Sequence, residues 1–456
     1  MGKGCCRAGG EEQPVQRAGC QVVQGAGEPA RSAGYWWSGL PADAVQIDGV
    51  NVATPESNQA ADAARAASGA ERVWVQMRDG RIGAVARGEV EVPVAVAPVL
   101  LPGLVDLQIN GFAGFDPNSP DVTPETLVGM ARALWTTGVT SFCPTITTQS
   151  FDHMVRSVRA VAQACAADVQ VNRSILGVHL EGPYVSGEDG PRGAHPAEWV
   201  RDPDWDEFQR LQEAAEGRIR IVTLAPERAG AVQFIRKLVN SGVLVSIGHT
   251  AAGSEQIRAA IDAGATLSTH LGNGAHGHIR RHPNYIWDQL AADELVAGII
   301  VDGHHLPAAV VKVFWRAKGP ERLYLVSDAV AIAGLPPGRY VALGQQVELT
   351  ASGRVNLLGT EYLAGSALEL RQAVLNFMRF TGVGLAQAWA LASTRPLALL
   401  LGQDEDITGE ALFHLGARAD LVLADANELR QGRVKVLAVV LGGEVVYQAS
   451  APTPEL

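Results

Sequence analysis

Three short apolar runs of this sequence end in side chains that bind metals well. They are ILGVHLE at residues 175–181, VLVSIGH at residues 243–249 and ATLSTH at residues 265–270. Nine of the eleven histidines lie between residues 179 and 305. Imidazoles and carboxylates gathered at the carboxyl ends of successive strands are typical of a metal held in a parallel barrel. These runs therefore predict an enzyme.

Strand-like and helix-like segments alternate from residue 101 onward, which predicts a (β/α)8 TIM barrel of the α/β class. The strand candidates are rich in Val, Ile and Leu and almost continuously apolar, as expected for parallel strands buried on both faces. Eight repeats over roughly 250–300 residues match the size of this barrel. A doubly wound open sheet is the alternative, and it would place ligands near a single switch point. The predicted strands are 103–109, 139–144, 174–180, 219–225, 243–249, 265–270, 296–302 and 322–328.

The segments before and after the barrel alternate apolar and polar residues, as short half-buried strands do. Residues 43–100 and 405–450 are therefore predicted to form one small β-domain from both terminal flanks, with the barrel at residues 101–404. A further strand pair around residues 340–358 interrupts the chain between the eighth strand and its helix. Residues 1–42 are rich in Gly, Ala and Gln, and we expect them to form a disordered leader.

The composition excludes several classes of function. A net charge of −11 argues against non-specific binding to nucleic acid, which needs a basic face. No apolar stretch reaches the roughly 20 residues that cross a bilayer, so no membrane insertion is expected. The five cysteines are too few and too clustered for a disulfide framework, which favours a reducing cytoplasm. An anionic substrate would need a local basic patch.

The best candidate ligand set is Glu181, His249 and His270, at the ends of the third, fifth and sixth predicted strands. Three protein ligands leave an open position for water, which a hydrolytic zinc site needs. Asp328 closes the eighth strand, where it is placed to take a proton from that water and to pass it to a leaving amine. Each histidine alone would more often be a structural residue, but four such residues at equivalent strand ends favour a metal site.

The first predicted strand holds amides where many metal-dependent hydrolases hold a His-x-His pair. Gln108 and Asn110 occupy this frame. Amides are poor metal ligands beside imidazole, so we expect one divalent ion per chain. Zinc is the expected metal, although two histidines and a glutamate also accept Fe²⁺, Co²⁺ or Mn²⁺.

Eight motifs between residues 101 and 425 carry a resemblance to a known family. They are PGxxDxQxNG at 102–111, HLEGPY at 179–184, GAHP at 193–196, GHT at 248–250, THLxN at 269–273, DGHH at 302–305, SDA at 327–329 and LAGS at 363–366. With them the chain resembles the N-acetylglucosamine-6-phosphate deacetylases of the amidohydrolase superfamily.

The resemblance implies roles for the residues already singled out. It implies that Glu181, His249 and His270 bind one metal and that Asp328 is the general acid/base. It also implies a homodimer whose phosphate site is completed across the interface. By position, the substrate contacts that it implies are Ala194, His195, Asn273, Gly274, Arg281, His305, Leu363, Ala364 and Gly365.

The most basic segment of the barrel is HGHIRRH at residues 276–282. In an acidic protein this segment is the natural seat for a phosphate, because arginine can make a bidentate fork to it. A solvated loop is the alternative interpretation of the same run. The residues around 272–284 also differ from the usual family pattern, with Gly272 in place of an aromatic residue and Asn273-Gly274-Ala275 in place of Asn-Ala-Met.

The sequence thus supports a leading hypothesis and two others. The leading one is metal-dependent removal of acetyl from N-acetylglucosamine 6-phosphate, a small-molecule substrate. The second keeps the deacetylation but changes the substrate to an unphosphorylated or differently substituted N-acyl amino sugar. The third is a catalytically inactive barrel that serves as a binding protein, which would be expected to lack a ligand or Asp328. Cyclic-amide hydrolysis is disfavoured because His-x-His and an obvious bridging lysine are missing.

Overall fold

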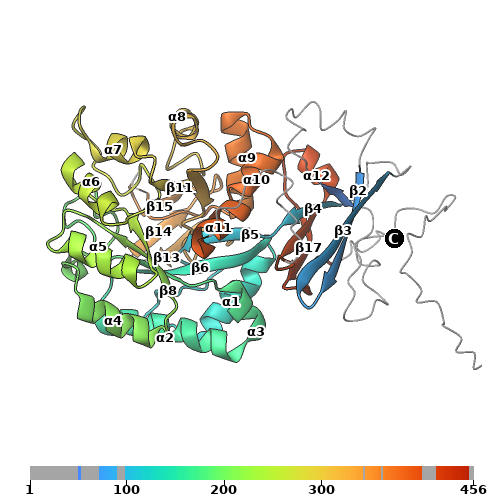
Figure 1. Cartoon of the computed structure of the whole chain (residues 1–456), viewed down its shortest axis with the longest axis horizontal. Coiled ribbons are helices and arrows are strands. Elements are labelled where there is room, and N and C mark those ends of the chain that lie inside the picture. Colours follow the sequence, from blue (N-terminus) through green and yellow to red (C-terminus); the bar gives the residue numbers. More distant parts are fainter. Residues whose placement is uncertain are drawn as a thin grey trace, which may run out of the picture.

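Eight parallel strands form a nearly closed barrel in the computed structural model of this chain (Figure 1). Each of the eight predicted strands is present, so the predicted fold class is confirmed. The strands are β5 Leu104–Ile109, β6 Val139–Thr147, β7 Val178–Glu181, β8 Ile219–Leu224, β9 Leu244–Ile247, β10 Leu267–Ser268, β11 Val296–Ile300 and β12 Leu323–Val326.

The structure describes residues 50–52, 71–89, 98–342, 345–360, 363–402 and 417–450. The leader predicted at residues 1–42 lies outside these ranges, and nothing is concluded about it.

Backbone hydrogen bonds close the barrel between its first and last strands. Seven parallel pairings join β5 through β12 in chain order. The Asp328 N–H then donates to the Gln108 carbonyl at 2.9 Å, and the Asn110 N–H donates to the Ala329 carbonyl at 2.8 Å. These bonds bring the end of the last strand beside the end of the first, which is where the predicted site residues lie.

Helices surround the barrel strands (Figure 1). Side-chain caps fix where several of them begin: Asp204 accepts a hydrogen bond from the Glu207 N–H at 3.0 Å, and Asn284 accepts from the Ile286 N–H at 3.1 Å. The helices are α1 Pro124–Trp135, α2 Phe151–Ala167, α3 Val169–Ser174, α4 Trp205–Ala214, α5 Ala231–Asn240, α6 Ser254–Asp262, α7 Tyr285–Ala291, α8 Ala308–Lys318, α9 Leu370–Thr381, α10 Leu385–Ala390, α11 Thr394–Leu401 and α12 Ala426–Arg430.

Strands from both flanks join a single seven-stranded sheet beside the barrel. Its order is β18-β17-β16-β4-β1-β2-β3, and β16 pairs with β4 in antiparallel register. This sheet supports the proposed β-domain, whose boundaries of 43–100 and 405–450 stay a proposal, as does the barrel range 101–404. The strands are β1 Val50–Val52, β2 Glu71–Arg78, β3 Arg81–Glu89, β4 Val99–Pro102, β16 Leu421–Ala424, β17 Val436–Leu441 and β18 Glu444–Gln448.

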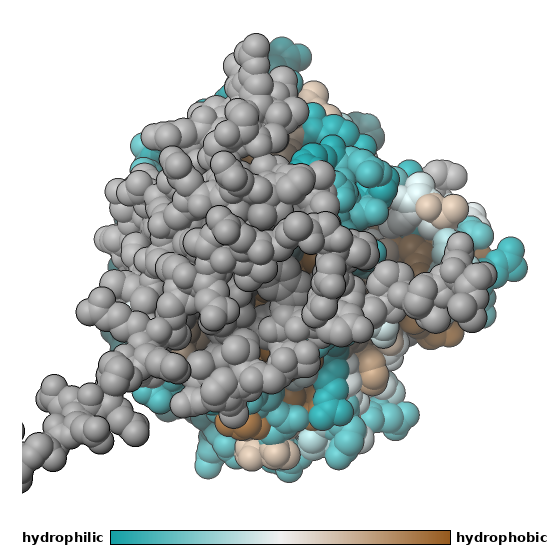
Figure 2. Space-filling view, turned by 90° about the vertical axis from the view of Figure 1, so that its right-hand side faces the viewer, coloured by the Kyte–Doolittle hydropathy of each residue, from teal (hydrophilic) through white to brown (hydrophobic). Residues whose placement is uncertain are grey.

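The chain passes from this sheet into the barrel at Gly103. A Cβ at this position would lie 2.0 Å from Thr140 Oγ1, so the junction has room only for glycine. From the side of the seven-stranded sheet, the described part of the surface mixes hydrophilic and hydrophobic residues (Figure 2). Within the described residues, no helix combines the length and apolar character needed to span a membrane.

The interruption after β12 contains three strands, where the sequence predicted a pair. They are β13 Gly338–Ala342, β14 Gln345–Leu349 and β15 Val355–Leu357. The third strand is only three residues long and follows a turn at residues 350–354. Such a short run has too little periodicity to be separated from the turn by pattern alone. The small sheet buries its own apolar cluster, which includes Val347 and Leu349.

Candidate metal centre

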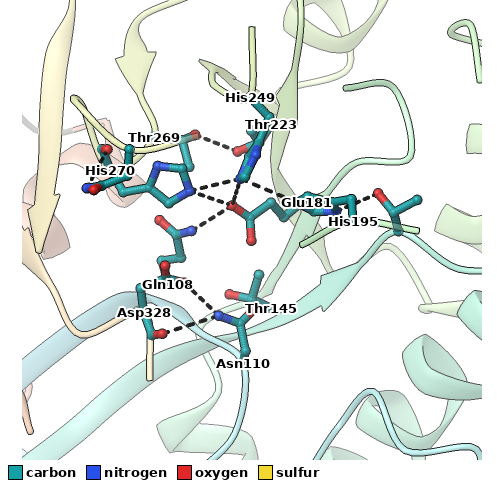
Figure 3. A network of polar contacts seen from close by, with 12 residues as sticks. Gln108, Asn110, Thr145, Glu181, His195, Thr223, His249, Thr269, His270 and Asp328 are labelled. Carbon is teal, nitrogen blue, oxygen red and sulfur yellow. Dashed lines mark hydrogen bonds and ion pairs between the residues drawn. The ribbon is translucent and has the colours of Figure 1, made fainter. Parts of the chain in front are cut away.

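Three buried side chains converge at the carboxyl end of the barrel (Figure 3). Glu181, His249 and His270 each offer one ligand atom, and these atoms all lie within 4.8 Å of one another. The two Nε2 atoms are 3.0 Å apart, and they lie 3.2 Å and 3.1 Å from the same Glu181 oxygen, Oε1. Three donors bound at about 2.0–2.1 Å to one tetrahedral zinc ion would be separated by only slightly more. The predicted ligand set is therefore assembled in space.

The chemistry of these atoms fits a cation. The Pro191 carbonyl can only accept a hydrogen bond, and it lies 2.9 Å from His249 Nδ1, so this nitrogen carries the proton and Nε2 presents a lone pair. That lone pair faces a carboxylate oxygen and another imidazole nitrogen. Burial acts to raise the pKa of Glu181, but the adjoining imidazoles of His249 and His270 hold it well below the ordinary value. A site that concentrates lone pairs and negative charge in this way suits a divalent metal ion.

The two amides of the first strand serve these groups through hydrogen bonds. Gln108 Nε2 donates to Glu181 Oε1 at 2.8 Å, and Asn110 Nδ2 donates to Asp328 Oδ1 at 2.6 Å. Gln108 therefore turns its N–H donor, and not its carbonyl oxygen, toward Glu181.

Asp328 lies at the end of β12, beside the metal-binding group. Loss of hydration raises the pKa of its carboxyl group to about 6, and the nearby negative charge of Glu181 acts in the same direction. The hydrogen bond from Asn110 opposes this shift only in part. A carboxylate with such a pKa is charged at neutral pH and accepts a proton more readily than an ordinary aspartate.

Three residues of the candidate site share an uncommon backbone conformation. His249, His270 and Asp328 have φ values of 50°, 28° and 49°, in the left-handed region. Such a conformation costs a non-glycine residue about 1–3 kcal/mol, and it persists only where the surroundings hold it. Each residue lies two positions after the end of its strand, β9, β10 or β12. The left-handed turn follows the strand and aims the side chain across the barrel mouth.

The loop after β7 brings the predicted contact His195 to the site. Its Nε2 lies 3.3 Å from His249 Nε2, and its Nδ1 lies 2.7 Å from Thr148 Oγ1. Burial lowers the pKa of His195 to about 3, so this ring is neutral. Ala194 precedes it on the same loop and is exposed.

The predicted contacts on the loop after β10 divide into two groups. Asn273 and Gly274 lie against the metal-binding group: Asn273 Nδ2 donates to the His270 carbonyl at 3.1 Å, and a Cβ at Gly274 would lie 2.7 Å from His249 Nδ1. Arg281 is exposed, and the structure gives it no direct contact with the metal-binding group. In a single chain without a partner subunit, the basic segment thus fits the interpretation as a solvated loop.

The remaining predicted contacts border the end of β12. His305 Nδ1 lies 2.6 Å from Asp302 Oδ2, and the charge of His305 lowers the pKa of Asp328 against the larger effect of lost hydration. The segment Leu363–Gly365 leads into Ser366, whose carbonyl accepts a hydrogen bond from the Val330 N–H at 2.9 Å. This contact ties the segment to the residues that follow Asp328.

Sequence reasoning did not identify a buried layer of hydroxyl groups beneath the metal-binding group. Thr269 Oγ1 lies 2.6 Å from Thr223 Oγ1 and 2.5 Å from Ser246 Oγ, and Thr223 Oγ1 is 2.7 Å from His179 Nε2. A signal was present for Ser246, which interrupts the otherwise apolar strand β9. Glu227, which contacts the turn after His249, was also missed.

Comparison with known proteins gives consistent matches. A model of the amidohydrolase family matches residues 99–446. The N-acetylgalactosamine-6-phosphate deacetylase of Escherichia coli O157:H7 is 36% identical over 356 residues, which cover 77% of this chain and 90% of that protein. The N-acetylglucosamine-6-phosphate deacetylase of Lysinibacillus sphaericus is 33% identical over 375 residues, covering 80% of this chain and 94% of that protein. A solved variant of N-acetyl-D-glucosamine-6-phosphate deacetylase from Mycobacterium smegmatis, in complex with N-acetyl-D-glucosamine-6-phosphate, gives a TM-score of 0.73 at 30% identity and covers 89% of this chain and 99% of that one.

Proposed function

The chain belongs to the amidohydrolase family, in the branch that contains the N-acetylglucosamine-6-phosphate and N-acetylgalactosamine-6-phosphate deacetylases, and from this membership we propose that it converts N-acetylglucosamine 6-phosphate into glucosamine 6-phosphate and acetate. The observation that carries the proposal is the convergence of Glu181, His249 and His270 beside Asp328. No member of this set is missing, which disfavours the catalytically inactive barrel.

Members of this family are metal-dependent hydrolases, and we propose that this chain holds one zinc ion through Glu181, His249 and His270. A divalent metal bound there would supply Lewis-acid chemistry, acidifying a water molecule and polarising the amide carbonyl. Gln108 donates a hydrogen bond to Glu181 and holds its carboxylate toward the two imidazoles. Iron, cobalt and manganese suit the same donors.

Asp328 is the residue that moves the proton in this proposal. It accepts a proton from the water that attacks the acetyl carbonyl carbon, and it delivers this proton to the amine as the C–N bond breaks. The products are acetate and the free amino sugar. Asn110 holds the carboxylate by its hydrogen bond to Oδ1 during both transfers. The proposed substrate contacts are Ala194, His195, Asn273, Gly274, Arg281, His305, Leu363, Ala364 and Gly365.

The proposal is tested by assaying the metal-loaded protein on a panel of four sugars. The panel contains N-acetylglucosamine and N-acetylgalactosamine, each with and without a 6-phosphate, and release of free amine is measured. We expect N-acetylglucosamine 6-phosphate to have the highest kcat/KM, by about tenfold or more, because sites that bind hydroxyl groups through hydrogen bonds discriminate strongly. The proposal is wrong if none of the four sugars is deacetylated.

A second candidate substrate is N-acetylgalactosamine 6-phosphate. The Escherichia coli O157:H7 relative, at 36% identity, carries that activity in its name. The same panel decides between the two epimers. Equal rates with and without the phosphate would instead favour an unphosphorylated or differently substituted N-acyl amino sugar.

We predict one tightly bound divalent ion per chain. The reason is that Gln108 and Asn110 act as hydrogen-bond donors to Glu181 and Asp328, so the first strand offers no second set of ligands. Elemental analysis of the dialysed protein should return one equivalent. Two equivalents, with Gln108 or Asn110 bound to the second ion, would contradict the prediction.

Phosphate recognition is proposed to depend on Arg281. Replacing Arg281 with Ala should raise KM for the phosphorylated sugar by roughly 10- to 100-fold, as expected for the loss of about 1.5–3 kcal/mol of charge-assisted hydrogen bonding. The KM of the unphosphorylated sugar should stay almost unchanged. Arg236→Ala, an exposed arginine on α5, is the control and should affect neither sugar. Equal effects of Arg281→Ala on both sugars would remove Arg281 from the phosphate site.

We also propose that the protein is a homodimer of the cytoplasm. Arg281 is exposed on the loop after β10, where a second subunit has access to it, and this position supports a phosphate site completed across an interface. The small number of cysteines supports a reducing compartment. Light scattering during gel filtration tests the assembly, and a monomer that is fully active at micromolar concentration would contradict the shared site.

A further inference from the structure

Hydrogen bonds hold both sides of the turn that follows β9. On one side, the Ser186 N–H donates to the His249 carbonyl at 2.8 Å, and the Pro191 carbonyl accepts from His249 Nδ1 at 2.9 Å. Both of these partners lie on the loop after β7. They fix the His249 ring, but they leave the residues after it to be held by another group.

Glu227 holds the other side of this turn. It lies three residues after the end of β8, and it is partly buried. Thr250 Oγ1 donates to Glu227 Oε2 at 2.6 Å, and the Ala251 N–H donates to Glu227 Oε1 at 2.7 Å. Both carboxylate oxygens are therefore engaged with the two residues that directly follow His249.

We propose that Glu227 is a positioning residue for the metal ligand His249, acting by holding the left-handed turn that aims Nε2 at Glu181. Charge-assisted hydrogen bonds to a backbone N–H and a hydroxyl are strong enough to maintain a backbone conformation that histidine rarely adopts by itself. Glu227 lies outside the candidate metal group of the described residues, so it supports the site from its outer side. The inference rests on the metal centre proposed above.

The position of Glu227 explains why one carboxylate serves the turn better than a neutral group. A glutamine at position 227 keeps an oxygen that accepts from the Ala251 N–H, but its amide nitrogen cannot accept from Thr250 Oγ1. An alanine keeps neither bond. A graded series of Glu, Gln and Ala thus separates the two hydrogen bonds.

The experiment measures metal affinity by competition with a chromophoric zinc chelator, together with the rate of zinc release. Glu227→Ala should weaken zinc affinity by roughly 10- to 100-fold, the usual effect of losing an outer partner of a metal ligand. Glu227→Gln should fall between Glu227→Ala and the unaltered protein. The KM for the sugar should stay within about twofold in both variants, because the substrate contacts are unchanged.

Two further variants make the test specific. Thr250→Val removes the hydroxyl, and combining it with Glu227→Ala should weaken zinc binding no more than Glu227→Ala alone, because both changes break the same hydrogen bond. Glu255→Ala, which removes an exposed glutamate on α6, is the control and should leave affinity unchanged. If Glu227→Ala fails to fold, Glu227→Gln and Thr250→Val carry the test.

Zinc affinity of Glu227→Ala and Glu227→Gln equal to that of the unaltered protein would overturn the inference, even if both variants melt at a lower temperature. His249→Ala distinguishes this failure from a failure of the metal site. If His249→Ala loses zinc while the Glu227 variants keep it, Glu227 does not position His249. If His249→Ala also keeps zinc, the metal centre itself has been assigned to the wrong residues.

Discussion

Asp328→Asn should lower kcat by about 10²- to 10⁴-fold, the range expected when a general acid/base is lost. Asparagine has the shape of aspartate and keeps an oxygen that accepts the hydrogen bond from Asn110. The fold and the bound metal should therefore remain. What is lost is a carboxylate whose pKa is raised to about 6, which accepts a proton from water and returns it to the amine.

Steady-state kinetics and metal content, measured on the same preparation, check this prediction. Asp121→Asn is the matched control, because Asp121 is exposed on the loop before α1. It should leave both quantities unchanged. An Asp328→Asn protein that retains more than about a tenth of the original kcat would show that another group moves the proton.

His270→Ala should reduce kcat/KM by about 10³-fold or more and leave the protein with much less than one equivalent of metal. Its Nε2 lies 3.0 Å from His249 Nε2 and 3.1 Å from Glu181 Oε1, so its removal opens one side of the ligand set. Residues that act as one unit give non-additive losses, so adding Asp328→Asn should reduce activity little further.

Treatment with a chelator is an independent way to prepare the protein without its metal. Chelator-treated original protein should lose activity and regain it when zinc is restored, whereas His270→Ala should not recover. The melting temperature of His270→Ala should also fall. An ion that binds only the folded state, present at a free concentration of 100 times its Kd, stabilises that state by about 2.7 kcal/mol. Gln233→Ala removes an exposed polar side chain on α5 and serves as the control. Full activity after complete metal removal would rule out the metal-dependent mechanism.

The barrel was predictable because each of its strands is a buried apolar run with a turn signal after it. The ends of these runs also predicted which side chains meet, since parallel strands point their carboxyl ends to one edge. The length of β10 was less predictable. The run at 265–270 looks like the others, but only Leu267–Ser268 form the strand. The left-handed turn at His270 removes this residue from the extended backbone, and no local pattern signals it.

The supporting residues were hidden for a different reason. Glu227 and Pro191 contact the segment 249–251 across 23 to 58 positions of sequence. Neither belongs to a periodic pattern or to a spacing typical of metal ligands. Their effect depends on how two loops are placed over the barrel, which is tertiary information. The exposed position of Arg281 has the same origin, because a sequence shows the charge but not where the loop points.

The pairing of β4 with β16 has a consequence for how the chain is made. Pro102 pairs with Leu421, so one edge of β4, whose other edge pairs with β1, waits for a partner more than three hundred residues later in synthesis. Contacts between such distant residues form slowly, and an unpaired strand edge is prone to associate with other chains. On the ribosome, the barrel strands are all completed before this sheet is joined. A nascent chain that stops before β16 is thus the species most exposed to aggregation and most dependent on chaperones.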